Sequence, residues 1–217
     1  MKPVNARILH AAMREFAEKG ATQIAVSDLA KEAGLSRGTI YNNIENPDGL
    51  FDQVCELLYL ELRQTLRHST GHLTDPAEGL ALIIQQSIRR VHEEHDWGRF
   101  IAQFAMMDHR LGKVWGKLPR RLLTQGLEDG RFDFDPDQMV SITALGGGAI
   151  MGATSMVLAG VQTWRQSSAD TAELYLRAIG VSQPEARQIS LQRFDPLPRL
   201  DFASIDLPEP VEDALQT

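Results

Sequence analysis

The amino-acid sequence predicts an all-α protein, in which a small N-terminal helical domain is joined by a connecting helix to a larger helical domain. Apolar residues recur every three or four positions along most of the 217 residues. The intervening breaks carry glycine, proline or helix-capping residues, and no segment alternates apolar and polar residues as a strand would. We predict domains at 1–46 and 47–192, followed by a proline-rich acidic tail at 193–217 that is extended or disordered.

Three helices are predicted in the first domain, over residues 4–19, 28–33 and 37–44. Glycine follows the first two helices, and serine precedes the second and third, as expected of C-terminal ends and N-caps. These boundary residues are Gly20, Ser27, Gly34 and Ser36.

The second domain begins with the sequence Asn46-Pro47-Asp48, which combines a capping side chain, a proline in the first turn and an acid. The connecting helix that starts there is predicted to end near His68. The further helices are predicted at 76–94, 97–108, 119–129, 136–164 and 168–180, with a short one from 183.

Composition places the chain among cytoplasmic globular proteins. It is 43% hydrophobic and 24% charged, and its one cysteine, Cys55, excludes an internal disulfide framework. Charged residues interrupt the first twenty positions, so we expect no signal peptide. Residues 138–164 carry no charge and are long enough to cross a bilayer, but they are rich in small residues rather than leucine. We therefore predict a buried helix at a protein interface and no membrane span.

Charge is distributed unevenly along the chain. The net charge is −7, yet residues 1–50 hold six basic and six acidic residues and are neutral. The acidic excess therefore lies downstream, which argues against contact between the larger domain and nucleic acid.

Residues 26–51 have the spacing that a helix-turn-helix requires. Ala30 is small enough for the close crossing of two helices, and four residues later Gly34 tolerates the positive φ of a tight turn. The apolar residues that would form the small core are Leu29, Ala33, Leu35, Ile40 and Ile44. A plain helical hairpin, with its polar residues facing water, is the alternative interpretation.

With Ile40 directed inward, the third helix presents a set of polar residues to solvent. Arginine can bond guanine through two hydrogen bonds, asparagine can bond adenine, and the threonine and tyrosine hydroxyls can hold phosphates. Glycine permits close approach of the backbone to DNA. The predicted DNA-binding residues are Ser27, Ser36, Arg37, Gly38, Thr39, Tyr41 and Asn42.

The segment from Ile8 to about Leu58 resembles the tetracycline-repressor (TetR) family of regulators. The run Gly38-Thr39-Ile40-Tyr41 matches the family pattern, whereas Ile44 replaces the usual phenylalanine and Pro47 replaces a lysine that usually holds a DNA phosphate. The resemblance implies a transcription regulator, most often a repressor, that binds a double-stranded DNA operator. It also implies a homodimer whose C-terminal domain binds a small-molecule effector.

Two further sites are predicted in the larger domain. Aromatic and methionine side chains would suit an apolar or aromatic effector, although such residues can equally form plain core. The candidate ligand-binding residues are Tyr59, Trp97, Phe100, Phe104, Met107 and Trp115. Small residues would let the helices of two subunits pack closely, with burial inside one subunit as the alternative. The candidate dimer residues are Gly148, Gly152, Ser155 and Leu174.

Signals for catalysis are missing from the sequence. It contains no phosphate loop, nucleophile elbow or nucleotide fingerprint, so we predict neither an enzyme nor a cofactor. His92 and His95 are three residues apart instead of the four that a zinc motif needs, and we predict no metal site. An enzyme with an accessory helix-turn-helix and a protein-interaction module that has lost DNA binding remain alternative hypotheses.

Overall fold

A computed structural model describes residues 2–44, 46–200 and 202–205, with the backbone alone at 113–115. Its regular elements are helices throughout, and no strand occurs in the described ranges, which confirms the predicted fold class. The ten α-helices of the described chain are α1 (Pro3–Lys19), α2 (Val26–Ala33), α3 (Arg37–Asn43), α4 (Leu50–Thr70), α5 (Pro76–Glu93), α6 (His95–Phe104), α7 (His109–Glu128), α8 (Met139–Leu158), α9 (Trp164–Ala178) and α10 (Gln183–Ser190). Three short 3₁₀ helices are η1 (Pro47–Gly49), η2 (Pro136–Gln138) and η3 (Phe202–Ser204).

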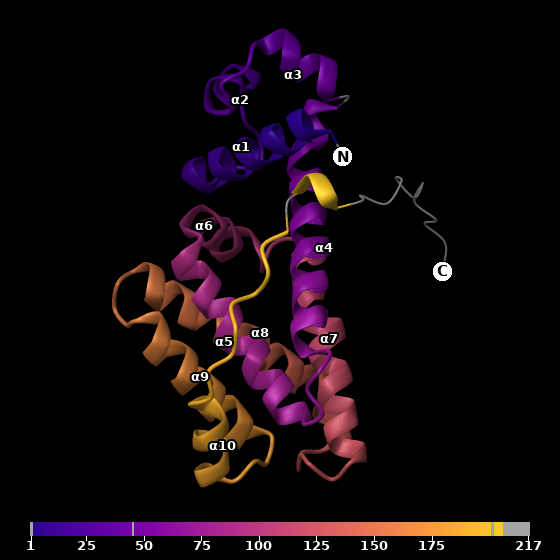
Figure 1. The fold of residues 1–217 in the computed structure, drawn as a ribbon, viewed down its shortest axis with the longest axis vertical. Coiled ribbons are helices and arrows are strands. Elements are labelled where there is room, and N and C mark those ends of the chain that lie inside the picture. The colour runs from indigo at the N-terminus through magenta and orange to yellow at the C-terminus, as the bar shows by residue number, and fades with distance from the viewer. Residues whose placement is uncertain (1, 45, 201, 206–217) are drawn as a thin grey trace.

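The molecule is elongated, with α1, α2 and α3 forming a head at one end and the remaining helices forming a body (Figure 1). Helix α4 starts beside the head and runs along the body, where it packs against α7 and α5. Helix α5 is the centre of the body, since it contacts α6, α7, α8, α9 and α10. The head contacts the body through α1, which packs against both α4 and α6.

An aromatic cluster fastens the head to the body. Phe16 of α1 and Phe51 of α4 pack edge to face with ring centroids 5.2 Å apart. Phe104 of α6 lies 5.0 Å from Phe51, and Phe100 lies 4.9 Å from Phe104. Phe100 and Phe104 are predicted from the sequence to bind a ligand, but in the structure both are buried in this junction.

Several predicted helix starts differ from the structure, among them that of α9, which begins at Trp164 and not at 168. Helix α2 begins at Val26 with Ala25 in the capping position, so Ser27 lies in the first turn and is not the N-cap. Helix α7 begins ten residues earlier than predicted, and Pro119 lies inside it. The start is fixed by Asp108, whose carboxylate accepts hydrogen bonds from the backbone N–H groups of Arg110 and Leu111. Pro119 has no backbone N–H, so the helix lacks one hydrogen bond there. The packing of α7 against α4, α5 and α8 outweighs that loss of stability.

A buried ion pair joins α4 to α5. The Glu61 carboxylate is fully buried and accepts a hydrogen bond from the Arg90 guanidinium, which lies 4.4 Å from the centre of the Trp97 ring. Burial raises the pKa of Glu61, and the charge and hydrogen bond of Arg90 oppose that shift. The arrangement also accounts for the burial of Trp97, another candidate ligand-binding residue.

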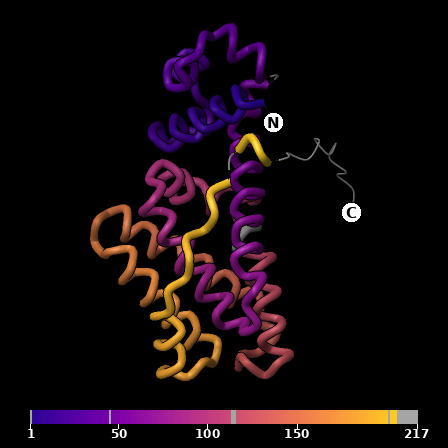
Figure 2. The backbone as a smooth tube through the Cα atoms, in the orientation of Figure 1, coloured from indigo at the N-terminus to yellow at the C-terminus, as the bar shows by residue number. Residues whose placement is uncertain are grey.

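The chain after α10 returns along the body to the head as an irregular strap, defined here as residues 192–200 and 202–205 (Figure 2). Gln86 donates a hydrogen bond to the carbonyl of Phe194, which holds the strap against α5. At its far end Phe202 is buried and stacks on the His10 ring of α1 with centroids 3.9 Å apart. The first part of the predicted tail is therefore packed, while residues 201 and 206–217 lie outside the described chain.

Candidate nucleic-acid interface and effector pocket

The turn between α2 and α3 has the geometry that its sequence predicts. Gly34 adopts φ +60° and ψ 40°, and its N–H bonds the carbonyls of Ala30 and Lys31. The N–H of Leu35 also bonds the carbonyl of Ala30, at 2.9 Å, which closes the end of α2. Ala30 and Ile40 are both buried where the two helices meet. The turn therefore holds α3 at a fixed angle to α2.

Helix α3 is capped by a serine, as predicted. The Ser36 hydroxyl accepts a hydrogen bond from the Thr39 N–H at 3.0 Å and shares a second, at 2.9 Å, with the Thr39 hydroxyl. At the other end, the Asn43 side chain donates to the Thr39 carbonyl at 2.8 Å. These bonds stabilise a helix of only seven residues, which would be marginal without them.

The face of α3 away from the core is open to solvent. Arg37, Gly38 and Asn42 are exposed, and the Tyr41 side chain is 60% exposed despite its size. A Cβ added to Gly38 would meet only the Ser36 hydroxyl, at 3.7 Å, so a neighbouring molecule can approach this backbone closely. Six of the seven predicted DNA-binding residues thus lie together at the start and along the outer side of α3, and Ser27 is half-buried in α2.

Two acidic side chains of the head are paired with basic residues other than Arg37. Arg14 pairs with Glu32 at 2.5 Å, and Lys19 pairs with Asp28 at 2.6 Å. The hydrogen bond from Lys19 lowers the pKa of Asp28, which keeps that carboxyl ionised. Within the described residues, Arg37 has no ion-pair partner. Its positive charge is therefore available to a phosphate or a guanine edge.

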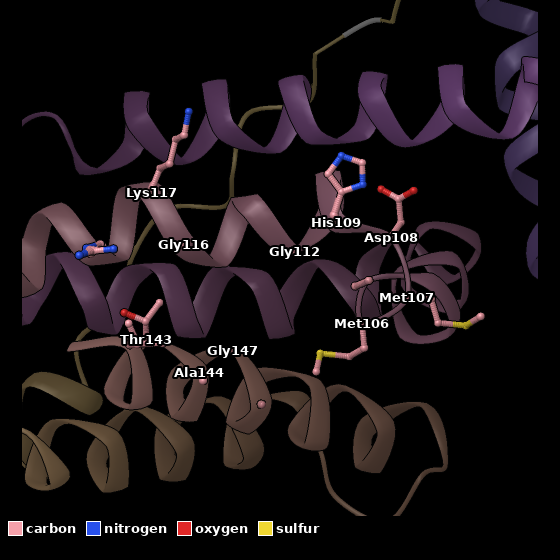
Figure 3. A pocket seen from close by; sticks show the side chains of 14 residues that line it. Met106, Met107, Asp108, His109, Gly112, Gly116, Lys117, Thr143, Ala144 and Gly147 are labelled. Atoms are coloured by element: carbon pink, nitrogen blue, oxygen red, sulfur yellow. The ribbon is translucent and has the colours of Figure 1, made fainter. Parts of the chain in front are cut away.

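The body contains a pocket between α7 and α8 with a volume of about 640 Å³. In Figure 3 the small residues Gly112, Gly116, Ala144 and Gly147 lie along its middle, with Met106 and Met107 at one end and Thr143 toward the other, where the Lys117 side chain leaves α7 in the direction of α4. The remaining lining residues are Ala105, Asp108, His109, Arg120, Val140 and Gly148. Such a volume is in the range of about 300–1,000 Å³ that small-molecule sites occupy.

Of the predicted ligand-binding residues, Met107 lies in this pocket. Tyr59 is buried on α4 beneath the Arg63 guanidinium, and the Trp115 side chain lies outside the described residues. The glycines of the lining were not predicted from the sequence, because a glycine contributes to a pocket only by leaving space, and no sequence pattern indicates that space. Lys117 and Arg120 were also not predicted, because they can be assigned to the pocket only when α7 is known to begin at His109.

One face of the body, formed by α8 and α9, exposes apolar and small side chains. Gly148, Gly152 and Ser155 are exposed along α8, and Leu174 of α9 is 62% exposed. No described atom lies within 4 Å of a Cβ placed at either glycine. Gly146 differs, because a Cβ there would meet the Tyr175 ring at 2.9 Å, so this glycine packs α8 against α9 within the subunit. The four predicted dimer residues therefore belong to an open surface.

The segment Pro136–Leu158, which contains α8, is also long and apolar enough to cross a membrane by length and composition. About 28% of its apolar window is buried within the subunit. This is weak support for a membrane span, because a helix that pairs with a second subunit has the same composition.

The fold and these two sites define a helix-turn-helix protein with a helical sensor-type body, and comparison with known families agrees. The family model for bacterial regulatory proteins of the tetR family matches residues 8–54. The model for the tetracyclin repressor-like C-terminal domain matches residues 75–192, which is more than half of the chain. The chain belongs to the TetR family.

Curated relatives match mainly the N-terminal part. The uncharacterized HTH-type regulator YvkB of Bacillus subtilis is 38% identical over 52 residues, which are 24% of this chain and 28% of that protein. The regulator MT1294 of Mycobacterium tuberculosis is 29% identical over 87 residues, 40% of this chain and 43% of that one. The chain thus aligns with less than half the length of these relatives.

Solved structures match over most of the chain. RolR, in complex with its ligand resorcinol, superposes with a TM-score of 0.68 and 27% identity, over 90% of this chain and 96% of that one. FadR from Bacillus halodurans, a fatty acid degradation regulator, gives a TM-score of 0.71 over 84% of this chain and 99% of that one. Its identity of 20% supports the fold alone.

Proposed function

We propose that this protein is a cytoplasmic, sequence-specific DNA-binding regulator, a homodimeric repressor that a small-molecule effector releases from its operator. The observation that carries the proposal is the exposed face of α3, where Arg37, Tyr41 and Asn42 project from a helix that Ser36 caps and Gly34 orients. Family membership supports the same function.

In this proposal α3 enters the major groove. Arg37 bonds a guanine and Asn42 an adenine, while the hydroxyls of Thr39 and Tyr41 hold phosphates. Pro47 lies in η1, at the position where the family usually has a phosphate-binding lysine, so this protein makes one contact fewer to the DNA backbone. We therefore expect the DNA affinity to fall as salt is added. The fall of log affinity with log salt concentration should be less steep than in a relative that has the lysine.

A gel shift with DNA flanking the protein's own coding region tests this function. Arg37→Ala is expected to weaken binding by roughly 1–3 kcal/mol, the cost of one base contact. Tyr41→Phe removes only a hydroxyl and is expected to cost less. Arg99→Ala, which removes an exposed arginine from α6, is the matched control and should leave the shift unchanged. Absence of any shift at low salt would instead favour a protein-interaction module.

The homodimer in this proposal forms through the α8–α9 face, where two helices from each subunit make a four-helix contact. Because a two-fold interface repeats each residue, Leu174→Arg places two charges in it. We expect this variant to sediment as a monomer and to lose DNA binding. Leu191→Arg is the control, since Leu191 is equally exposed, at 62%, and lies after α10 outside that face. The proposed interface would be contradicted if both variants sedimented at the same rate as the parent protein.

Release by an effector follows from a population shift. A ligand in the pocket between α7 and α8 favours one arrangement of α7, and α7 packs along α4, which starts beside the head. A change in α4 alters the separation of the two α3 helices, which must match successive major grooves roughly 34 Å apart. The bound resorcinol of RolR, an aromatic ligand, supports an effector with an apolar or aromatic body.

A further inference from the structure

We propose that the pocket between α7 and α8 binds an amphiphilic anion, a molecule with an apolar body and one carboxylate or phosphate group. This inference rests on the proposed function, because it specifies the chemistry of the effector. Three features of the pocket carry it: its shape, its apolar end and the cations at its other end.

The shape favours an elongated ligand. Gly112 and Gly116 lie four residues apart on α7, and Arg120 follows after four more, so all three share one helix face. Eight residues of helix extend about 12 Å. On the opposite side, Ala144 and Gly148 repeat the same spacing on α8. The glycines leave a channel between the two helices, along which a narrow ligand body can lie.

One end of the channel is apolar and adaptable. Met106 and Met107 are 73% and 78% exposed, which is unusual for long apolar side chains. A ligand body placed here would remove these side chains from water. Methionine suits such a site, because its unbranched side chain adjusts to ligands of different shape.

The other end is cationic and unneutralised. Arg120 lines the pocket one helical turn beyond Gly116, and Lys117 lies at its rim with its side chain directed toward α4 (Figure 3). Both side chains are exposed, and within the described residues neither has an ion-pair partner. The acid of the lining, Asp108, is already engaged by the Arg110 guanidinium at 2.6 Å and by the N-terminus of α7. The pocket therefore carries the positive charge of Arg120, with that of Lys117 at its rim, in a protein of net charge −7. An anionic group on the ligand would neutralise this positive charge and accept hydrogen bonds from it.

A binding assay with matched probes tests the inference. Dodecanoate, dodecyl phosphate and 4-butylbenzoate serve as anionic probes, and dodecanol and 4-butylbenzyl alcohol serve as neutral counterparts, all below their micellar concentrations and measured by calorimetry on the full chain. We expect at least one anionic probe to bind roughly tenfold or more tightly than its neutral counterpart, the gain from one charge-assisted hydrogen bond. Failure of every anionic probe to bind, or equal binding of the neutral ones, would overturn the inference.

Variants then locate the site. Lys117→Gln and Arg120→Gln are expected to weaken the anionic probe about tenfold without changing the neutral one. Arg121→Gln, the next residue of α7 and absent from the lining, removes the same charge and should have no effect. Gly116→Leu fills the channel where no described atom lies within 4 Å, so it should abolish binding without lowering the melting temperature. Equal loss in Arg121→Gln, or unchanged binding in Gly116→Leu, would contradict the site.

The gel shift separates this inference from the proposed function. An anionic probe that binds but leaves a DNA complex intact supports the pocket chemistry and contradicts its effector role. If the wild-type protein shifts DNA but binds no anionic probe, the proposed regulator function stands and the proposed ligand chemistry of the pocket is overturned.

Discussion

The turn of the helix-turn-helix can be tested with two glycines that share one conformation. Gly34 and Gly20 end α2 and α1 with φ of +60° and +63°. A Cβ at Gly20 would meet no described atom within 4 Å, whereas a Cβ at Gly34 would lie 2.7 Å from the guanidinium of Arg7. That guanidinium donates a hydrogen bond of 3.4 Å to the Gly34 carbonyl. Substitution by alanine therefore strains both sites equally but disturbs a contact at Gly34 alone.

The magnitudes follow from these contacts. A left-handed alanine costs about 1–2 kcal/mol, and the reduced freedom of the unfolded chain returns about 0.4–1 kcal/mol. Gly20→Ala is thus expected to lower the free energy of unfolding by roughly 0.5–1 kcal/mol. Gly34→Ala should lower it by about 0.5 kcal/mol more, because the exposed Arg7 side chain must move and lose its long hydrogen bond.

Urea denaturation followed by circular dichroism measures both variants, with an unchanged m-value as the check on the comparison. Repeating the measurement in an Arg7→Ala background is the decisive control, since the excess cost of Gly34→Ala should vanish there. Gly34→Asn should retain more stability than Gly34→Ala, because asparagine tolerates the left-handed region. A Gly34→Ala protein as stable as the parent would refute the reasoning about the turn.

Three further predictions concern the body. Arg90→Met leaves the buried Glu61 carboxylate without its partner and should lower the free energy of unfolding by about 3–5 kcal/mol. Arg89→Met breaks a partly exposed ion pair and should lower it by under about 1 kcal/mol. Equal losses in urea titrations would contradict the role of the buried pair. Burial raises the pKa of the Cys55 thiol, so Ellman's reagent at pH 8 should label it only after unfolding, and rapid labelling of native protein would contradict its burial. Burial acts to raise the pKa of Asp108, but the hydrogen bonds from the Arg110 side chain and from the N–H groups of Arg110 and Leu111, together with the Arg110 charge, outweigh burial and lower the pKa below its ordinary value. The stability that Asp108 contributes should be complete above that ordinary value and lost as pH falls through the lowered one, and Asp108→Asn should show a flatter acid profile.

Local sequence rules were sufficient for the head. Its helix ends are set by single residues with narrow conformational preferences, such as the positive φ of Gly34 and the capping hydroxyl of Ser36. The all-helical fold could also be predicted, because the apolar period is unbroken. Ser27 shows the limit of these rules, since a capping residue type is not a cap when the helix already begins at Val26.

The arrangement of the body could not be predicted from local sequence rules, because it depends on contacts between residues far apart in the chain. Proline at 119 predicts a helix start, yet packing on three neighbouring helices carries α7 through it. Aromatic residues at helical spacing suit a pocket and a core equally, and Phe100 and Phe104 became part of the junction with the head. The middle of the pocket exists because glycines leave space between α7 and α8, and the packed start of the tail depends on the distant contact of Phe202 with His10.

Selection of binding sites from a random-sequence DNA pool tests the central claim most directly. If α3 recognises bases, full-length protein should enrich a two-fold symmetric site whose half-sites lie about one helical turn apart. Arg37→Ala and Asn42→Ala should each relax the preference at one base pair per half-site while the rest of the motif persists. Failure to enrich any motif, or the same motif from parent and both variants, would contradict recognition by α3.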